Sequence, residues 1–410
     1  VENYVIGLQQ TGTVATLKHF VANNSDFRRR TSNSVVGERA LREIYMPGFE
    51  AGIESGAMAV MTSFNQVNGK YAPQSEYVVN KLLRGDLGFK WLVMSDWLSI
   101  WNAEKALKSG LDLDMPGESE DGVYSADDPE KYLRQEAGQL VELGRVNEAD
   151  IDPMVSNILT TIFAMQMPKP SYKELRYLDN YEQHEQIALE TAREGVVLLK
   201  NESLFPFKPK KGQYIQVVGD YVDSLAVGGG SAYVIGYNQI NLLTALQAEL
   251  GDAVRYSQNS SDEEIKNASL VLYTVATYDS EGSDVSFDLK SRDNVEINRL
   301  TRLNDNVGVI IYTGGGRNMS LWNDEVEAIL YGWYPGQIGN QAIAEMRGCN
   351  GVMIGRAAYR TPYVLTEMAQ RIFGRIPPRR DHVALAMAEY AETTIKTGVP
   401  LHSITRHMLG

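Results

Sequence analysis

Short apolar runs that end in polar residues recur through the first part of the chain. They cover residues 14–17, 57–63, 91–95 and 111–114. A short apolar run with polar boundaries is typical of a buried strand. Segments with apolar positions at helical spacing, such as residues 34–45, lie between the runs. The alternation predicts an α/β fold in which parallel strands are separated by helices.

A second series of apolar runs follows in residues 186–345. A helix is expected to run into residues 195–201, and strands are expected at residues 214–219, 269–275 and 308–313, with helical segments between them. Runs that are apolar throughout, rather than alternating, are typical of strands buried on both faces. This region therefore predicts an open α/β layer with a parallel core.

Helix start and stop signals set the expected boundaries. Asn147, followed by acidic residues, predicts a helix N-terminus, and the Pro-Lys-Pro sequence at 168–170 ends that helix. These signals separate a first domain at 1–166 and a polar linker at 167–185 from a second domain at 186–345. A tail at 346–410 starts abruptly after Gln341-Ala-Ile-Ala-Glu345.

Composition narrows the class of protein. The 410 residues are 43% hydrophobic and 22% charged, which is ordinary for a soluble globular protein. The net charge of −13 argues against nucleic-acid binding by the whole surface. One cysteine, Cys349, excludes an internal disulfide, and the five histidines show no metal-ligand spacing, so neither a metal nor a cofactor is expected. No apolar run approaches membrane-spanning length; the compartment stays open, because any signal peptide would precede Val1.

Two carboxylates stand out from the pattern. Asp96 directly follows the apolar run at 91–95, where an α/β barrel places its catalytic side chains, although a helix N-cap would explain the same residue. Glu281 lies in a polar loop after the run that ends at Val275, where a solvated surface acid is the alternative. Two carboxylates that converge from separate segments suit the cleavage of a glycosidic bond.

A series of motifs in one order gives the chain a specific resemblance. The motifs are Lys-His-Phe (18–20), Val-Met-Ser-Asp-Trp (93–97), Gly-Leu-Asp-Leu-Asp-Met-Pro-Gly (110–117), Glu-Gly-Val-Val-Leu-Leu-Lys-Asn (194–201), Gly-Gly-Gly-Ser-Ala (228–232), Ser-Glu-Gly-Ser-Asp (280–284) and Trp-Tyr-Pro-Gly-Gln (333–337). Together they resemble glycoside hydrolase family 3, the β-glucosidase and β-xylosidase family, over residues 1 to about 345.

The resemblance implies a retaining, exo-acting β-glycosidase that acts on a β-glucoside or a short β-linked oligosaccharide. It makes Asp96 the nucleophile and Glu281 the acid/base, the latter carried by a loop of the second domain. The absence of a second histidine after Lys-His-Phe argues against the N-acetylglucosaminidase branch of the family.

The resemblance also implies a set of sugar-binding residues. Lys18 and His19 match a pair that hydrogen-bonds sugar hydroxyls, and Lys18 is expected to be buried beside them. Arg29 matches an arginine of the cleft. Because Arg28 and Arg30 are also arginines, the matching position could be shifted by one residue. Trp97 offers an apolar face to a pyranose ring, with core packing as the alternative. The set is completed by Phe64, which stands where many members have a tyrosine.

Other features depart from the family. Val285 and Lys290 replace a usual arginine and proline. The first segment supplies about four strand–helix units, and a closed barrel of this type needs about eight. The expected architecture is therefore the second half of a (β/α)8-type barrel, then an open α/β sandwich domain, then a short, mostly helical tail. A half-barrel leaves open edges that a homodimer would cover. An inactive sugar-binding remnant is the alternative function.

The tail has a different resemblance. Residues 346–410 are similar to the C-terminal end of the tRNA-dihydrouridine synthases, in which a Gly-Arg pair, here Gly355-Arg356, helps to hold the flavin phosphate. This likeness is the basis of a second alternative, a flavin-dependent RNA reductase. A helical cap over apolar surface is the simpler interpretation of the same segment.

Overall fold

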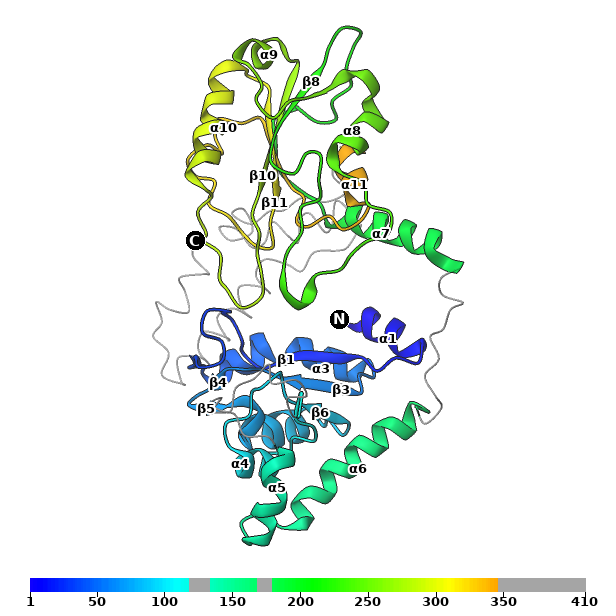
Figure 1. The fold of residues 1–410 in the computed structure, drawn as a ribbon, viewed down its shortest axis with the longest axis vertical. Helices are drawn as coiled ribbons and strands as arrows, with labels where there is room; N and C mark the ends of the chain where they lie inside the picture. The colour runs from blue at the N-terminus through cyan, green and yellow to red at the C-terminus, as the bar shows by residue number, and fades with distance from the viewer. Residues whose placement is uncertain (118–132, 168–178, 346–410) are drawn as a thin grey trace, which may run out of the picture. The chain divides into compact units, whose positions relative to one another are not determined.

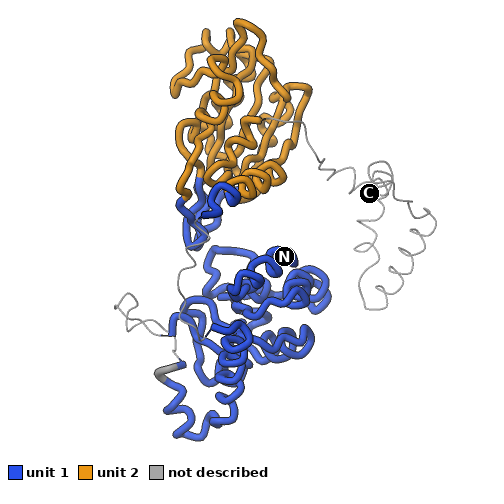
Figure 2. Tube along the Cα trace, turned by 90° about the vertical axis from the view of Figure 1, so that its right-hand side faces the viewer, with its two compact units in different colours: residues 1–184, 227–235, 278–287 blue, residues 185–226, 236–277, 288–410 orange. Residues whose placement is uncertain are grey.

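The computed structural model describes residues 1–117, 133–167 and 179–345. They form two compact units (Figure 2). Of the described residues, the first unit contains those within 1–184, 227–235 and 278–287, and the second contains those within 185–226, 236–277 and 288–345. The loop that carries Glu281 thus groups with the first unit, whereas its flanking segments group with the second. The predicted tail, 346–410, lies outside the described residues.

The first unit is built on a sheet of parallel strands taken in chain order, β1-β3-β6 (Figure 1). Thr16 pairs with Ala59, and Ala59 pairs with Leu92. A parallel bridge from Met94 to Leu113 adds the fourth apolar run at the far edge. The predicted parallel pairing of these runs is confirmed, and closure into a barrel stays a prediction. The strands are β1 Thr16–Phe20, β3 Ala59–Thr62 and β6 Leu92–Met94, and a small second sheet contains β2 Asn33–Ser34, β4 Gln66–Val67 and β5 Lys70–Tyr71.

The segments between these strands are largely helical. One predicted boundary is wrong, because Asn33 and Ser34 pair with β4 and the helix expected over 34–45 starts only at Glu38. The start at Asn147 is confirmed, since its N–H donates to Asp150 Oδ2 at 3.0 Å. The helices are α1 Glu2–Gln10, α2 Glu38–Ala40, α3 Pro47–Glu54, α4 Ala103–Lys108, α5 Leu133–Glu142 and α6 Glu148–Ala164, with a 3-10 turn η2 Ala72–Gln74 and π-helical segments η1 Leu41–Tyr45 and η3 Tyr77–Asp86.

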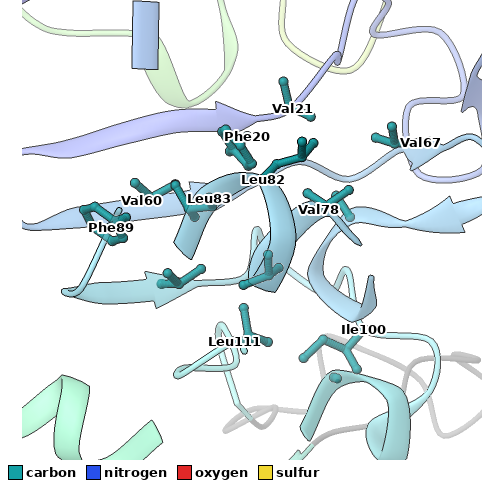
Figure 3. Close-up of a cluster of buried hydrophobic side chains, with 14 of the residues drawn as sticks. Phe20, Val21, Val60, Val67, Val78, Leu82, Leu83, Phe89, Ile100 and Leu111 are labelled. Carbon is teal, nitrogen blue, oxygen red and sulfur yellow. The ribbon is translucent and has the colours of Figure 1, made fainter. Parts of the chain in front are cut away.

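The core of the first unit lies between the sheet and its helices (Figure 3). Phe20 of β1, Val60 of β3 and Leu82 of η3 are fully buried in it. Phe20 also meets Phe49 of α3 edge to face, with ring centroids 4.8 Å apart. Burial of side chains this size contributes roughly 1.5–3 kcal/mol each. The packing fixes the carboxyl ends of the strands, where the candidate site residues lie.

A buried ion pair links the helical layer to the sheet. Arg84 of η3 donates from Nη2 to Asp112 Oδ2 at 2.7 Å, and the Asp112 side chain is 1% exposed. The same carboxylate accepts from the N–H of Val93 and from Asn157 Nδ2. One carboxylate therefore joins η3, β6 and α6.

Arg84→Met is expected to lower the free energy of unfolding of this unit by about 3 kcal/mol, because the buried Asp112 carboxylate loses its cationic partner. Lys81→Met, on the same helix, is the matched control. Lys81 pairs with Asp86 but its side chain is 58% exposed, so less than about 1 kcal/mol should be lost. The urea dependence of hydrogen exchange in peptides from β3 and β6 measures both, and equal effects would contradict the prediction.

The second unit is a six-stranded sheet in the order β7-β12-β11-β10-β8-β9. Strand β7 lies at one edge and is antiparallel to β12, whereas the other five strands are parallel to one another. The predicted parallel core is therefore confirmed. The sequence patterns did not predict β7, β9 or β12 as strands. The strands are β7 Val197–Asn201, β8 Ile215–Gly219, β9 Val254–Tyr256, β10 Leu270–Ala276, β11 Val307–Tyr312 and β12 Ala328–Tyr331.

Helices cover both faces of this sheet (Figure 1). Leu272 packs with α8 and α11 on one face, and its neighbour Val271 packs with α9 and α10 on the other. This explains why the strands read as continuous apolar runs. The helix α7 begins at Tyr181, inside the segment expected to be a linker, and the second unit begins at Glu185. The helices are α7 Tyr181–Gly195, α8 Leu242–Leu250, α9 Asp262–Asn267, α10 Ser291–Leu303 and α11 Gly339–Glu345, with 3-10 turns η5 Gly230–Ala232, assigned to the first unit, and η6 Gly251–Ala253.

Candidate active site

Asp96 lies just beyond the carboxyl end of β6. Its Oδ1 accepts a hydrogen bond from the N–H of Trp97 at 2.7 Å, and its side chain is only 10% exposed. The helix N-cap alternative is wrong, because the next helix, α4, begins at Ala103 and is capped by the side chain of Asn102. Burial raises the pKa of Asp96, and the Trp97 N–H and the nearby cationic groups oppose that rise.

His19 reaches Asp96 from β1, on the other side of β3. His19 Nε2 lies 3.3 Å from Asp96 Oδ2. Burial lowers the pKa of His19, and the charge of Asp96 works against this effect. Within the described parts of the chain, Oδ2 is buried and accepts no hydrogen bond of good geometry. That oxygen therefore keeps its lone pairs available for a reacting atom.

Lys18 contributes charge to the site but does not have the expected burial. It is exposed, while the next residue along β1 is partly buried, as the alternation of side chains along a strand requires. Its positive charge nevertheless lowers the pKa of both His19 and Asp96. The expectation of a buried lysine is therefore wrong for this structure.

Two glycine-dependent loops hold Glu281. Residues 227–235 and 278–287 are joined by a parallel bridge from Gly229 to Ser280. Gly230 has a φ of +80°, and a Cβ there would lie 2.4 Å from Glu281 Cβ. Only glycine allows the loops to approach this closely. The approach lets Ser231 donate to Glu281 Oε2 from its N–H at 2.9 Å and from its hydroxyl.

Arg29 joins the two sides of the site. Its Nη2 lies 2.9 Å from Glu281 Oε1 and its Nη1 lies 3.2 Å from Asp26 Oδ1. The guanidinium also lies over the ring of the buried Phe64, 4.6 Å from the centroid, in a cation–π contact. Of the three consecutive arginines, this is the one that the structure places on Glu281. Arg30 instead donates to the carbonyl of Leu98 at 2.8 Å.

The two carboxylates have opposite electrostatic environments. The hydrogen bonds from Ser231 have the largest effect on the pKa of Glu281, and Arg29 adds to it. Together they lower this pKa to about 2. The pKa of Asp96 is raised by burial. His19 feels the charge of both carboxylates, which places all three groups in one electrostatic cluster. In this arrangement Glu281 is ionised at neutral pH and is suited to accept a proton; to donate one, it must first lose part of this stabilisation.

Trp97 borders the cluster with a largely open face. It is 45% exposed, so packing inside the core does not describe it. An exposed indole beside a carboxylate offers an apolar surface to a sugar ring.

Sequence patterns missed Ser231 and Asp26 as parts of the site. For Ser231 the signal was available, since it directly follows the glycines at 228–230.

Two features that the described residues lack bear on other classes of function. Residues 1–117, 133–167 and 179–345 contain no group of three or more histidine, cysteine, aspartate or glutamate side chains placed to hold a metal ion. Across those same ranges, every helix is too short or too polar to cross a bilayer.

Comparison with protein families and curated proteins gives two matched domains and several relatives. Residues 1–161 match the Glycosyl hydrolase family 3 N terminal domain, and residues 196–375 match the Glycosyl hydrolase family 3 C-terminal domain. The chain is 29% identical over 416 residues to Beta-glucosidase BoGH3A of Bacteroides ovatus, covering 91% of this chain and 55% of that protein. It is 36% identical over 259 residues to Beta-glucosidase B of Emericella nidulans, covering 62% of this chain and 29% of that protein.

A solved structure shares the fold. Beta-glucosidase 3B from Thermotoga neapolitana, in complex with alpha-D-glucose, superimposes with a TM-score of 0.74 at 27% identity, covering 84% of this chain and 53% of that one. The chain thus spans about half the length, or less, of these relatives. The second domain match reaches residue 375, past the predicted end of the resemblance at 345, and none of these matches supports the dihydrouridine synthase likeness of the tail.

Proposed function

This chain belongs to glycoside hydrolase family 3, and from that premise we propose that it acts as a retaining β-glucosidase. The substrate would be a terminal β-linked glucose of a glucoside or of a short oligosaccharide, and no cofactor takes part. The proposal is carried by one observation: Asp96 and Glu281 meet in a single cluster through His19 and Arg29. The relatives, which carry the name β-glucosidase, support the choice of substrate class.

The proposed reaction is a double displacement. In the first step Asp96 attacks the anomeric carbon through its unbonded Oδ2, and the glycosidic oxygen leaves with a proton from Glu281. This step forms a glycosyl ester on Asp96 and releases the alcohol. In the second step Glu281 takes a proton from water, the water oxygen attacks the anomeric carbon, and the Asp96 carboxylate leaves. Two inversions give a product with the original β configuration.

The other residues have positioning roles in this scheme. His19 and Lys18 would donate to sugar hydroxyls, and the positive charge of Lys18 favours the ionised form of Asp96 that the first step needs. Trp97 would lie against the sugar ring. Arg29 would exchange its contact with Glu281 for one with the sugar. That exchange removes one of the groups that hold the pKa of Glu281 low, and so favours the protonated form required of the acid.

The full chain is expected to release nitrophenol from 4-nitrophenyl β-D-glucoside, with β-glucose as the first sugar detected by proton NMR. The α-glucoside, with the same leaving group, is the matched control and should not be cleaved. Glucose binding measured by calorimetry without any turnover would favour the inactive sugar-binding alternative. Formation of α-glucose first would exclude the retaining mechanism, because a single displacement inverts the anomeric centre.

A further inference from the structure

We propose that Asp284 is the positioning residue of the loop that carries the acid/base: it fastens that loop to the turn after β1 and so holds Glu281 in place when the contact with Arg29 is given up. This inference rests on the proposed function for the role of Glu281. The fastening itself is a structural feature and can be tested without catalysis.

The contact is a three-donor clasp around one carboxylate. Asp284 Oδ2 accepts from Ser25 Oγ at 2.7 Å and from the N–H of Phe27 at 3.2 Å. Its Oδ1 accepts from the N–H of Asp26 at 3.1 Å. The hydrogen bond from Ser25 lowers the pKa of Asp284 most, and the two N–H groups lower it further. The carboxylate is therefore ionised when it binds these donors. Consecutive backbone N–H groups with a hydroxyl form a good receptor for an anion.

The same turn holds the loop at a second point through a different interaction. Asp26 contacts Arg29, and Arg29 contacts Glu281. This second link depends on Glu281 being ionised and on Arg29 being free of substrate. The proposed reaction removes both conditions when substrate binds, because Arg29 then contacts the sugar and Glu281 must carry a proton before it can donate one. The donors that bind Asp284 are neutral, so neither protonation of Glu281 nor the movement of Arg29 to the sugar affects them. The clasp therefore remains when the ion pair between Arg29 and Glu281 breaks.

The loop has few other constraints between the two contacts. Gly282, with a φ of +87°, and Ser283 separate Glu281 from Asp284, and residues 281–284 are all exposed. The Glu281 carboxylate also accepts from Ser231, which lies on another loop. Without Asp284, the acid/base is therefore expected to sample positions away from the nucleophile.

Hydrogen exchange of the full chain tests the clasp directly. Asp284→Ala is expected to speed exchange at the amides of Asp26 and Phe27 and across residues 278–287. Asp288→Ala is the matched control, because it removes an exposed aspartate four residues later and leaves these donors untouched. Unchanged protection of Asp26 and Phe27 in Asp284→Ala would overturn the clasp.

Kinetics test the positioning role. Asp284→Ala should lower kcat for alkyl glucosides by about 10²-fold with little change in KM, because small displacements of a catalytic group can cost that much. The loss for 2,4-dinitrophenyl glucoside should be much smaller, since that leaving group needs little protonation. Faster exchange with equal losses for both substrates would overturn the role in positioning. If the unaltered chain hydrolyses neither substrate, the proposed function fails, whereas the exchange data still decide whether the clasp exists.

Discussion

Asp96→Asn is expected to lower kcat/KM for aryl β-glucosides by about 10⁴-fold, the size of loss typical when one member of a catalytic unit is removed. The amide is close to the carboxylate in shape and can still accept the N–H of Trp97 at the Oδ1 position. It cannot form the glycosyl ester, because a neutral amide is a poor nucleophile. The fold should survive, since the substitution leaves no buried charge unpaired.

The measurement combines steady-state rates with a covalent label. A 2-deoxy-2-fluoro-β-glucosyl fluoride slows breakdown of the intermediate, so mass spectrometry should find one sugar on the peptide that contains Asp96 in the unaltered chain and none in the variant. Asp86→Asn is the control: it also removes one aspartate charge, but in the surface pair with Arg42 and Lys81. Unchanged turnover in Asp96→Asn, or a label on another peptide, would refute the nucleophile.

The strand framework could be predicted from the sequence because burial imposes it locally. The apolar runs that became β1, β3 and β6 are too short for helices and too apolar for loops. Asp96 was identifiable for the same reason, as a carboxylate that interrupts such a run at its end. The error over residues 34–45 has a non-local cause: helical spacing was present, but pairing of Ser34 with Val67 of β4 took the first residues into a sheet.

The details of the site depend on contacts that no periodicity encodes. Asp284 and Ser25 are far apart in sequence, and only the folded first unit brings them together. The choice of Arg29 over its neighbours depends on the turn after β1, which contacts the loop at 278–287 through Ser25, Asp26, Phe27 and Arg29. The ionised state of Glu281 likewise comes from Ser231 and Arg29, which approach from two separate segments.

Glu281→Ala is expected to slow cleavage of alkyl glucosides by about 10³-fold and to leave the first step on 2,4-dinitrophenyl glucoside much less affected. General acid catalysis is worth roughly 10²–10⁴-fold, and it matters most where the leaving group is a poor one. The ester on Asp96 should then accumulate, because no base activates water. Added azide needs no base, and it should restore turnover and yield β-glucosyl azide.

Glu281→Gln separates proton transfer from loop position. The glutamine oxygen can still accept from the N–H and hydroxyl of Ser231, so the two loops should stay joined, whereas the alanine variant loses that link. If proton transfer is the role of Glu281, both variants lose activity toward poor leaving groups to a similar extent and both respond to azide. A nearly active Glu281→Gln would mean that the side chain only ties the loops together. Equal losses for good and poor leaving groups, with no azide product, would remove Glu281 from the mechanism, because an acid/base must act on the bond whose cleavage it assists.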